Sequence, residues 1–213
     1  MTIKRLAAVV ALATAFAATS AAAVPLSGLF NVNVNNFNAG GDGSNARAVG
    51  SNLWGEVDDF FRYDGALDFR VPNPDDTDTE TIADFLATGG GTVIGLDPNV
   101  ADDTLSTPTF QTTTIFSFKI AIPWDVMLTV THDDGIRVLD DGVIVADSVN
   151  PTVEKVTGPF LMTKGEARFI YVAANGNPSI FEVDVSPVPL PVPAALLLAG
   201  IGAMGATRLR KKA

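Results

Sequence analysis

The sequence contains no cysteine and a single histidine, His132, among its 213 residues. The lack of cysteine excludes disulfides, thiol nucleophiles and thiolate zinc sites, so the core has to be held by packing, with or without a metal ion. One histidine cannot supply a zinc site built from several imidazoles. It leaves one possible base for a Ser-His-Asp triad, and no G-x-S-x-G motif is present.

Basic residues are scarce between the two ends of the chain. Residues 24–186 contain all 24 acidic residues but only eight of the 14 basic ones, which gives a formal charge of −16. Phosphate binding draws on clustered Lys and Arg, so we expect no nucleic-acid partner. The negative charge favours solubility and attracts divalent cations, although a solvated acidic surface without a ligand is the alternative. These 163 residues suffice for one domain with a core.

The N-terminus has the pattern of a secretory signal peptide. Lys4 and Arg5 precede an uncharged run from Leu6 to Phe16, and small residues follow at positions 21–23. This pattern predicts cleavage after residue 23, with the mature chain beginning near Val24. An N-terminal membrane anchor is the alternative, but it requires about 20 apolar residues. We therefore expect the protein to be exported.

The C-terminus has the pattern of a single membrane span. Residues 188–207 carry no charge, and a basic cluster follows at 208–212. The length suits a transmembrane helix, and the positive-inside bias keeps the basic tail cytoplasmic and places the domain on the outer face. A buried helix of the domain is the alternative. The prolines at 187, 189, 191 and 193 argue against it because they form a stiff, extended spacer.

This terminus resembles a bacterial sorting signal. Residues 187–213 combine a proline-rich motif, a small-residue apolar helix and a basic end, and the motif is formed by Val188, Pro189, Leu190 and Pro191. Such segments are similar to the VPLPA-type and PEP-CTERM-type tails of Gram-negative bacteria, although Val192 and Pro193 intervene here before Ala194. The resemblance implies processing by an exosortase-like transpeptidase. It also implies a periplasmic or cell-surface protein that is membrane-anchored at least transiently.

The middle of the chain alternates apolar and polar residues with the period of half-buried strands. The alternation is visible in segments 30–35, 67–71, 116–122, 126–131, 169–173 and 181–185. Faces of this kind bury one side against a second sheet. Residues 24–186 are therefore expected to form an all-β domain, an antiparallel β-sandwich of jelly-roll-like type.

One short helix is expected over Glu80–Thr88, capped by Asp78 or Thr79 and ended by Gly89. Its apolar residues recur at helical spacing, at Ile82, Phe85 and Leu86. Two irregular stretches, 38–52 and 72–80, are interpreted as solvated loops. The GGDG of the first is a single copy of a calcium repeat that needs tandem copies, and the acids of the second lack the glycine and distal glutamate of an EF-hand.

The segment HDDGIRVLDDG, at 132–142, holds two Asp-Asp-Gly groups in different contexts. Asp141 and Gly142 lie between two apolar runs and fit a two-residue type I′ turn, in which both residues need positive φ. Asp133, Asp134 and Gly135 follow a strand and precede the next one. We therefore expect this first group at the tip of a sheet.

The run LTVTHDDGIRVLDDGVIVAD, followed by GEARFIYVAANGNPSIFEVDV, resembles the second half of the protective-antigen-type domain found in toxins, glycosidases and yeast flocculins. The resemblance covers residues 116–185 and leaves 41–109 without a counterpart. It implies a β-sandwich and, in the adhesin branch of the family, a calcium ion held by two neighbouring aspartates joined by a cis peptide bond. Those aspartates correspond to Asp133 and Asp134.

Calcium binds six to eight oxygens, so two carboxylates need further ligands. Asn175 and Asn177 are the best candidates because their loop connects the last two strands. A sugar then completes the coordination through paired hydroxyls, with Asp133, Asp134 and Asn175 as its contacts. Alternatively, the DDG group only shapes its loop.

The remaining candidates have plain structural interpretations. His132 is interpreted as a loop or surface residue rather than a ligand, since no second imidazole exists. Trp54 and Trp124 can stack on a sugar, but a tryptophan in a sandwich usually belongs to the core.

From the sequence we predict that the protein is not an enzyme and has the first of the following three functions, with the other two as alternatives. The first is carbohydrate binding or adhesion at the cell surface or in an extracellular matrix, and the second is glycoside hydrolysis. Hydrolysis would use an acid pair such as Asp58/Asp59 or Asp133/Asp134, but adjacency alone does not place two carboxyls about 5 to 9 Å apart across a glycosidic bond. The third is a structural envelope protein without a small ligand.

Overall fold

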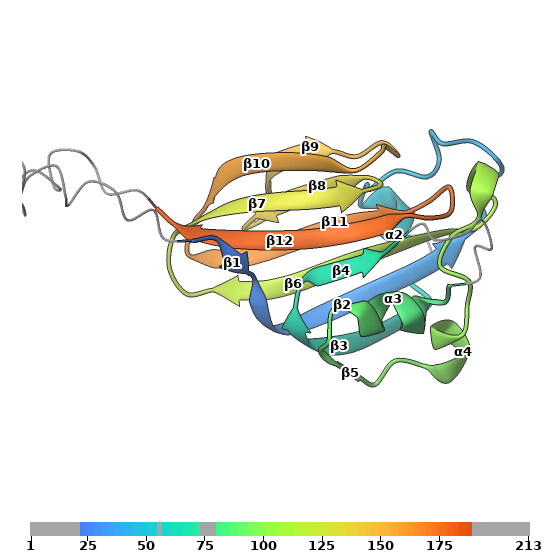
Figure 1. Cartoon of the computed structure of the whole chain (residues 1–213), viewed down its shortest axis with the longest axis horizontal. Helices are drawn as coiled ribbons and strands as arrows, with labels where there is room; N and C mark the ends of the chain where they lie inside the picture. Colours follow the sequence, from blue (N-terminus) through green and yellow to red (C-terminus); the bar gives the residue numbers. More distant parts are fainter. Residues whose placement is uncertain (1–21, 55–56, 73–79, 189–213) are drawn as a thin grey trace, which may run out of the picture. The chain divides into compact units, whose positions relative to one another are not determined.

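The alternating segments form two β-sheets that pack face to face (Figure 1). The computed structural model describes residues 22–54, 57–72 and 80–188, and Ala23–Ser186 forms one unit. Strands dominate this part of the chain, and every strand pairing with a defined register is antiparallel. The expected antiparallel β-sandwich is confirmed.

The five-stranded sheet lies in front in Figure 1, in the order β1-β12-β7-β10, and β4 also pairs with β12. Register is fixed by pairs such as Phe69 with Phe181 and Leu128 with Phe160. The strands are β1 (Val24–Pro25), β4 (Asp68–Val71), β7 (Val126–Asp133), β10 (Lys155–Met162) and β12 (Ser179–Pro187).

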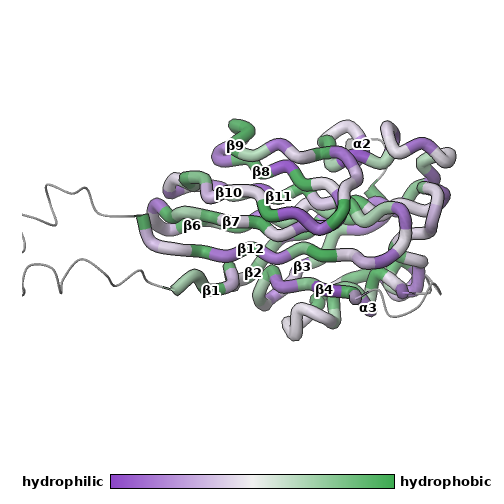
Figure 2. The backbone as a smooth tube through the Cα atoms, turned by 45° about the horizontal axis from the view of Figure 1, so that its top comes forward, coloured by the Kyte–Doolittle hydropathy of each residue, from purple (hydrophilic) through white to green (hydrophobic). Residues whose placement is uncertain are grey.

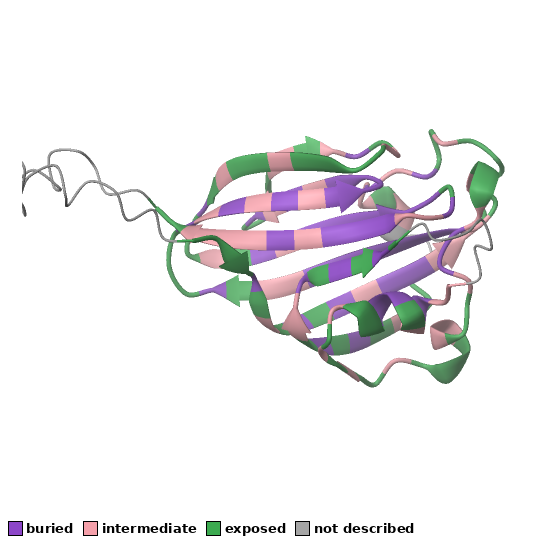
Figure 3. Ribbon diagram, viewed as in Figure 1, coloured by how far each residue is buried: buried purple, intermediate pink, exposed green. Residues whose placement is uncertain are grey.

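The second sheet has seven strands in the order β5-β3-β2-β6-β11-β8-β9. They are β2 (Ser27–Phe37), β3 (Asp59–Ala66), β5 (Thr92–Ile94), β6 (Thr113–Ile122), β8 (Ile136–Asp140), β9 (Val143–Ser148) and β11 (Gly165–Ala173). Buried residues alternate with more exposed ones along most strands, in agreement with the sequence (Figures 2 and 3).

Aromatic rings fill the space between the sheets. Phe69 lies at the centre, with its ring centroid 4.9 Å from Phe85 and 5.6 Å from Phe118. Tyr171 stacks on Phe181 at 5.0 Å with an interplanar angle of 10°. All five side chains are fully buried, and each such ring contributes a large apolar area to the core.

The stretch 38–52 is irregular, as expected, but it is solvated only in part. Ala39, Ala46 and Ala48 are buried, and they pack with Ile115 and Ile170 in a second apolar cluster on the outer face of the seven-stranded sheet. Strands β6 and β11 therefore bury both faces in this region. Small side chains let the irregular backbone lie close to the sheet. Residues 73–79 of the other stretch lie outside the described residues.

Helix α3 (Ile82–Thr88) begins two residues later than expected. Its N-cap is Thr81, whose hydroxyl accepts from the Asp84 N–H at 3.1 Å while the Asp84 carboxylate accepts from the Thr81 N–H at 3.0 Å. This capping box satisfies two backbone donors and replaces the expected cap at Asp78 or Thr79. Gly89 ends the helix, and the expected face of Ile82, Phe85 and Leu86 is buried, as the sequence predicts.

Short helical turns complete the described chain. They are α2 (Ser51–Trp54), α4 (Pro98–Ala101) and the 3-10 turn η1 (Pro108–Phe110). Asp141 and Gly142 connect β8 to β9 with φ values of 45° and 84°, so the expected two-residue turn with two positive φ values is confirmed.

Within the described ranges we find no helix whose length and apolar character would let it cross a membrane. Apart from Val188, the expected span and the sorting motif residues Pro189, Leu190 and Pro191 lie outside those ranges, as does the expected signal peptide up to residue 21.

Replacing Phe69 by Ala should lower the free energy of unfolding by about 3 to 5 kcal/mol, because the ring is fully buried among other rings and leaves a cavity. Phe60→Ala is the matched control, since Phe60 is 59% exposed, and it should change stability by less than about 1 kcal/mol. Urea unfolding followed by fluorescence measures both. Equal losses would contradict the central position of Phe69.

Candidate functional site

The β7–β8 turn places two neighbouring carboxyls at one end of the sandwich. Strand β7 ends at Asp133, the peptide bond from Asp133 to Asp134 is cis, and β8 begins at Ile136. Asp133 and Asp134 are only 6% and 4% exposed. The expected position of this group at the tip of a sheet is therefore observed.

The Asp134 carboxylate joins two segments that are distant in sequence. One oxygen accepts from the Thr152 N–H at 3.2 Å, and the other accepts from the Ala174 N–H at 2.7 Å. These donors belong to the β9–β10 connection and to the residue that follows β11. Asp134 therefore holds the β9–β10 connection and the start of the β11–β12 loop against the turn.

His132 hydrogen-bonds to the same turn from the interior of the domain. Its Nδ1 lies 2.5 Å from the Asp134 carbonyl oxygen and its Nε2 lies 2.8 Å from Thr157 Oγ1. Because a carbonyl only accepts, Nδ1 donates and Nε2 accepts from the hydroxyl. The ring is fully buried, and this burial lowers the pKa of His132. The expectation of a loop or surface histidine is thus wrong, and the residue serves as an internal support.

Tyr171 connects the turn to the aromatic core. Its hydroxyl donates to the Asp133 carbonyl at 2.5 Å, while its ring belongs to the stack between the sheets. Gly135 lies so close to the β9–β10 connection that a Cβ atom there would be 2.3 Å from the Val149 carbonyl oxygen. A side chain at this position would displace the backbone, so the glycine of the DDG group is required by packing.

Both carboxyls line a pocket of about 350 Å³. The loop between β11 and β12 supplies Asn175 and Asn177 to the same pocket, as expected from the sequence. The Asn175 side-chain oxygen accepts from the Thr109 N–H at 3.1 Å, and the Asn177 amide donates to Glu80 Oε2 at 2.6 Å. The four predicted residues are thus brought together, with the two amides also tied to neighbouring loops.

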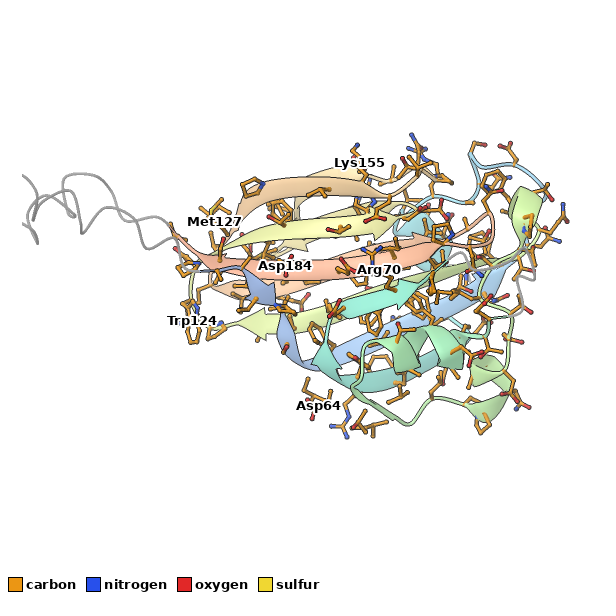
Figure 4. The ribbon with its side chains drawn as sticks, viewed as in Figure 1. Asp64, Arg70, Trp124, Met127, Lys155 and Asp184 are labelled. Atoms are coloured by element: carbon orange, nitrogen blue, oxygen red, sulfur yellow. The ribbon has the colours of Figure 1, made fainter. Side chains whose placement is uncertain are left out.

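The sequence did not indicate the wall formed by residues 151–153 or the contribution of Phe110, both of which line the pocket. Next to this wall, Glu154 pairs with Arg70 at 3.1 Å, and Arg70 pairs with Glu182 at 2.7 Å (Arg70 is labelled in Figure 4). No local motif marks these positions, because strand pairing and turn geometry bring them to the site.

Burial dominates the electrostatics of the acid pair. It raises the pKa of Asp133 to about 6 and that of Asp134 to about 8, against opposing hydrogen bonds from backbone N–H groups. The neighbouring Asp133 charge raises the Asp134 pKa further. No Lys or Arg of the described chain forms an ion pair with either carboxylate. A bound cation would therefore stabilise their ionised forms.

The donor groups around the turn suit some metal ions and not others. Across the described ranges, no three Asp, Glu, His or Cys side chains converge on a common point. Two carboxylates and nearby amide groups are hard oxygen donors, which suit calcium and not zinc. Further ligands would have to be carbonyl oxygens, water or the hydroxyls of a bound molecule.

The other sequence candidates lie elsewhere. Asp58 accepts from the Asn36 N–H and Asp59 accepts from the Asp97 N–H, and neither residue lines the pocket. Trp124 is 67% exposed and lies at the end of the sandwich where β12 finishes, away from the pocket loops (Figure 4). It is therefore not a core residue. The side chain of Trp54 is outside the described part.

In buffer with EDTA, the folded protein should lose stability as pH rises from about 4 to about 8. An acid whose folded pKa is raised keeps its proton in the folded state while the unfolded chain ionises, so the stability present below pH 4 is lost through this window. The Asp134 contribution should be on the order of a few kcal/mol. Thermal unfolding of wild type and Asp134→Asn across this range should show a flatter profile for the variant. Parallel profiles would contradict the raised pKa.

No protein-family model matches the sequence, and no curated protein matches it. Among solved structures, the PA14 sugar-binding domain from an RTX adhesin is 15% identical with a TM-score of 0.52, over 75% of this chain and 90% of that one. The PA14 domain of the MpAFP antifreeze protein is 18% identical with a TM-score of 0.48, over 82% and 90%. The GH31 alpha-xylosidase Xac1773 from Xanthomonas citri is 11% identical with a TM-score of 0.38, over 83% and 17%. The domain is thus similar in fold to the PA14 sugar-binding domain of the RTX adhesin.

Proposed function

We propose that the domain binds carbohydrate in the pocket beside Asp133 and Asp134, with a calcium ion held by these two carboxylates. One observation carries this proposal: two adjacent, buried carboxyls line an open pocket and have no cationic partner in the described chain. Buried charges in proteins are normally paired or coordinate a metal. A calcium ion is the partner that the oxygen donors at this position suit best.

The surrounding loops support ligand binding at this position. Asp134 accepts hydrogen bonds from Thr152 and Ala174, so the turn, the β9–β10 connection and the β11–β12 loop are held in one arrangement before any ligand arrives. Asn175 and Asn177 bring amide groups that can hydrogen-bond hydroxyls or add oxygen ligands. Such preorganisation reduces the entropy that binding has to offset.

The pocket size favours a small ligand unit. Its volume of about 350 Å³ lies at the lower end of the range of small-molecule sites, about 300 to 1,000 Å³. A calcium ion in this position would coordinate paired hydroxyls of a sugar, and the loop amides would orient the sugar ring. A terminal sugar residue with neighbouring hydroxyls is the class of ligand that meets both requirements.

The likeness to the PA14 sugar-binding domain of an RTX adhesin supports carbohydrate as the ligand class. We propose binding and adhesion instead of hydrolysis or a purely structural role, because the acid pair is adjacent in sequence and buried on one turn. Glycoside hydrolysis needs two carboxyls about 5 to 9 Å apart on either side of the bond. Asp58 and Asp59 do not supply such a second carboxyl to this pocket.

Calcium at millimolar concentration should raise the melting temperature of the wild-type protein by several degrees, because it binds the folded state preferentially. Asp134→Asn should abolish the shift. Asp103→Asn should retain it, since Asp103 is exposed, lies outside the pocket and removes the same charge. Differential scanning fluorimetry with calcium, magnesium and EDTA measures the effect. A glycan array with and without EDTA then tests whether sugar binding depends on the same ion.

The outcomes separate the three functions. Calcium-dependent glycan binding that is lost in Asp134→Asn supports the proposal. Release of sugars from a bound glycan would favour hydrolysis. A melting temperature that does not respond to calcium, together with an array without signals, would leave a structural role.

We further propose that the protein is exported and sorted to the cell surface, with an exosortase-like enzyme and the membrane as partners. The support is the sequence pattern of residues 1–23 and 187–213 and the VPLP motif at 188–191. Mass spectrometry of the surface protein should find an N-terminus near Val24 and loss of the peptide that follows the motif. An intact C-terminus would instead indicate a plain membrane anchor.

A further inference from the structure

Exposed apolar side chains gather at the end of the sandwich where β12 finishes. Trp124 is 67% exposed in the β6–β7 turn, Val143 is 67% exposed at the start of β9, and Leu161 is 46% exposed near the end of β10. Met127 is the cross-strand partner of Leu161, and it is labelled together with Trp124 at this end in Figure 4. We call Trp124, Met127, Val143 and Leu161 the apolar end of the domain.

Hydrogen bonds hold the turns of the apolar end together. The Lys164 N–H donates to the Asp125 carboxylate at 2.8 Å, and the Glu166 N–H donates to the Asp141 carboxylate at 2.7 Å. The β6–β7 and β8–β9 turns are therefore both tied to the β10–β11 turn and the start of β11. These two acids accept from backbone donors, and Glu166 pairs with Lys119 at 3.6 Å. The end is thus a preformed surface whose acidic groups at the turns have partners.

The chain leaves the domain from the same end. Strand β12 ends at Pro187 (Figure 1), and the uncharged run that predicts a membrane span begins at residue 188. Even a span that begins only at Ala194 is separated from Ser186 by no more than the seven residues 187–193. A fully extended chain spans at most about 3.6 Å per residue, so this linker reaches no further than about 25 Å. A membrane anchor would therefore hold the apolar end close to the bilayer surface, at a high effective concentration.

We infer that the apolar end rests on the outer surface of the bilayer, with Trp124 and Leu161 among the lipid headgroups. The inference depends on the proposed membrane anchor and adds a lipid contact that the domain itself makes. Tryptophan favours the membrane–water interface, because its ring is apolar and its N–H finds polar partners there. The short linker makes the bilayer the nearest apolar surface. Asp184 at this end and the formal charge of −16 favour zwitterionic over anionic lipid.

This orientation has a consequence for the proposed sugar site. The pocket lies at the end of the sandwich where β12 begins, and the apolar end lies where β12 finishes. A domain that rests on the apolar end therefore presents the pocket away from the bilayer, toward ligands outside the cell.

The test uses the full-length protein reconstituted into phosphatidylcholine vesicles, with lipids brominated close to the headgroup as fluorescence quenchers. The chain has two tryptophans, so contact of Trp124 with these lipids should remove up to about half of the tryptophan emission. Trp124→Phe should abolish this quenching. Leu161→Asp should reduce it at least about twofold, because a charge replaces apolar area in the contact. Phe60→Asp is the matched control and should behave like wild type, since Phe60 is 59% exposed on β3, outside the apolar end.

Alkaline carbonate extraction of the same vesicles separates this inference from the proposed anchor. Release of the protein by carbonate would contradict the anchor and this inference with it. A protein that stays with the lipid but shows no quenching, or equal quenching in Trp124→Phe, would overturn the inference and leave the anchor intact. Loss of glycan-array signals in Trp124→Phe, without lipid quenching of the wild type, would assign this side chain to a sugar and would also overturn the inference.

Discussion

The arrangement of the domain depends on the stack of aromatic rings between its two sheets. Tyr171 belongs to this stack and also contacts the turn that borders the pocket. Its ring packs on Phe181 and on Phe85, which lies 5.6 Å away, and its hydroxyl holds the carbonyl of Asp133. The polar end of a buried tyrosine needs a partner, and here the partner is the backbone of the turn itself. The positions of the two acid side chains are thereby set by core packing as well as by the loop sequence.

Periodicity predicted the strands β2, β4, β6, β7, β11 and β12, because each of them has a face in the core. It did not predict β1, β3, β5 or β10: three of these bury few side chains, and in β3 the exposed Phe60 breaks the alternation. The sequence also identified the apolar face of α3 and the β8–β9 turn, where Asp141 and Gly142 need a backbone geometry that few residues adopt. The packing of part of the stretch 38–52 against the sheet was missed because the composition of the stretch is that of a loop. Three alanines carry its packing, and alanines at irregular spacing give no periodic signal. The helix start differed because the Thr81 and Asp84 capping box competes with caps two or three residues earlier.

The candidate site was predictable in part. The carboxylates and the asparagines share a pocket because the β7–β8 turn and the β11–β12 loop lie at the same end of the sandwich, which the order of the strands implies. The wall at 151–153 and the role of His132 were not predictable. The first depends on how the β9–β10 connection crosses between sheets. The second depends on a buried carbonyl and hydroxyl that the ring satisfies, and a sequence does not reveal which polar groups will need such a partner.

Strand β12 links the two ends of the sandwich in a single run. It begins beside the pocket loop at Ser179 and ends at Pro187, where the chain leaves the sheet at the opposite end (Figure 1). Nine residues of strand span about 30 Å. A force that pulls the two ends of the sandwich apart would run parallel to β12, and the ladder bonds of β12 to β4 and β1 lie across that direction. Such a geometry loads the bonds in shear, so they have to rupture together and not one after another, and the domain should resist unfolding by a force along this strand.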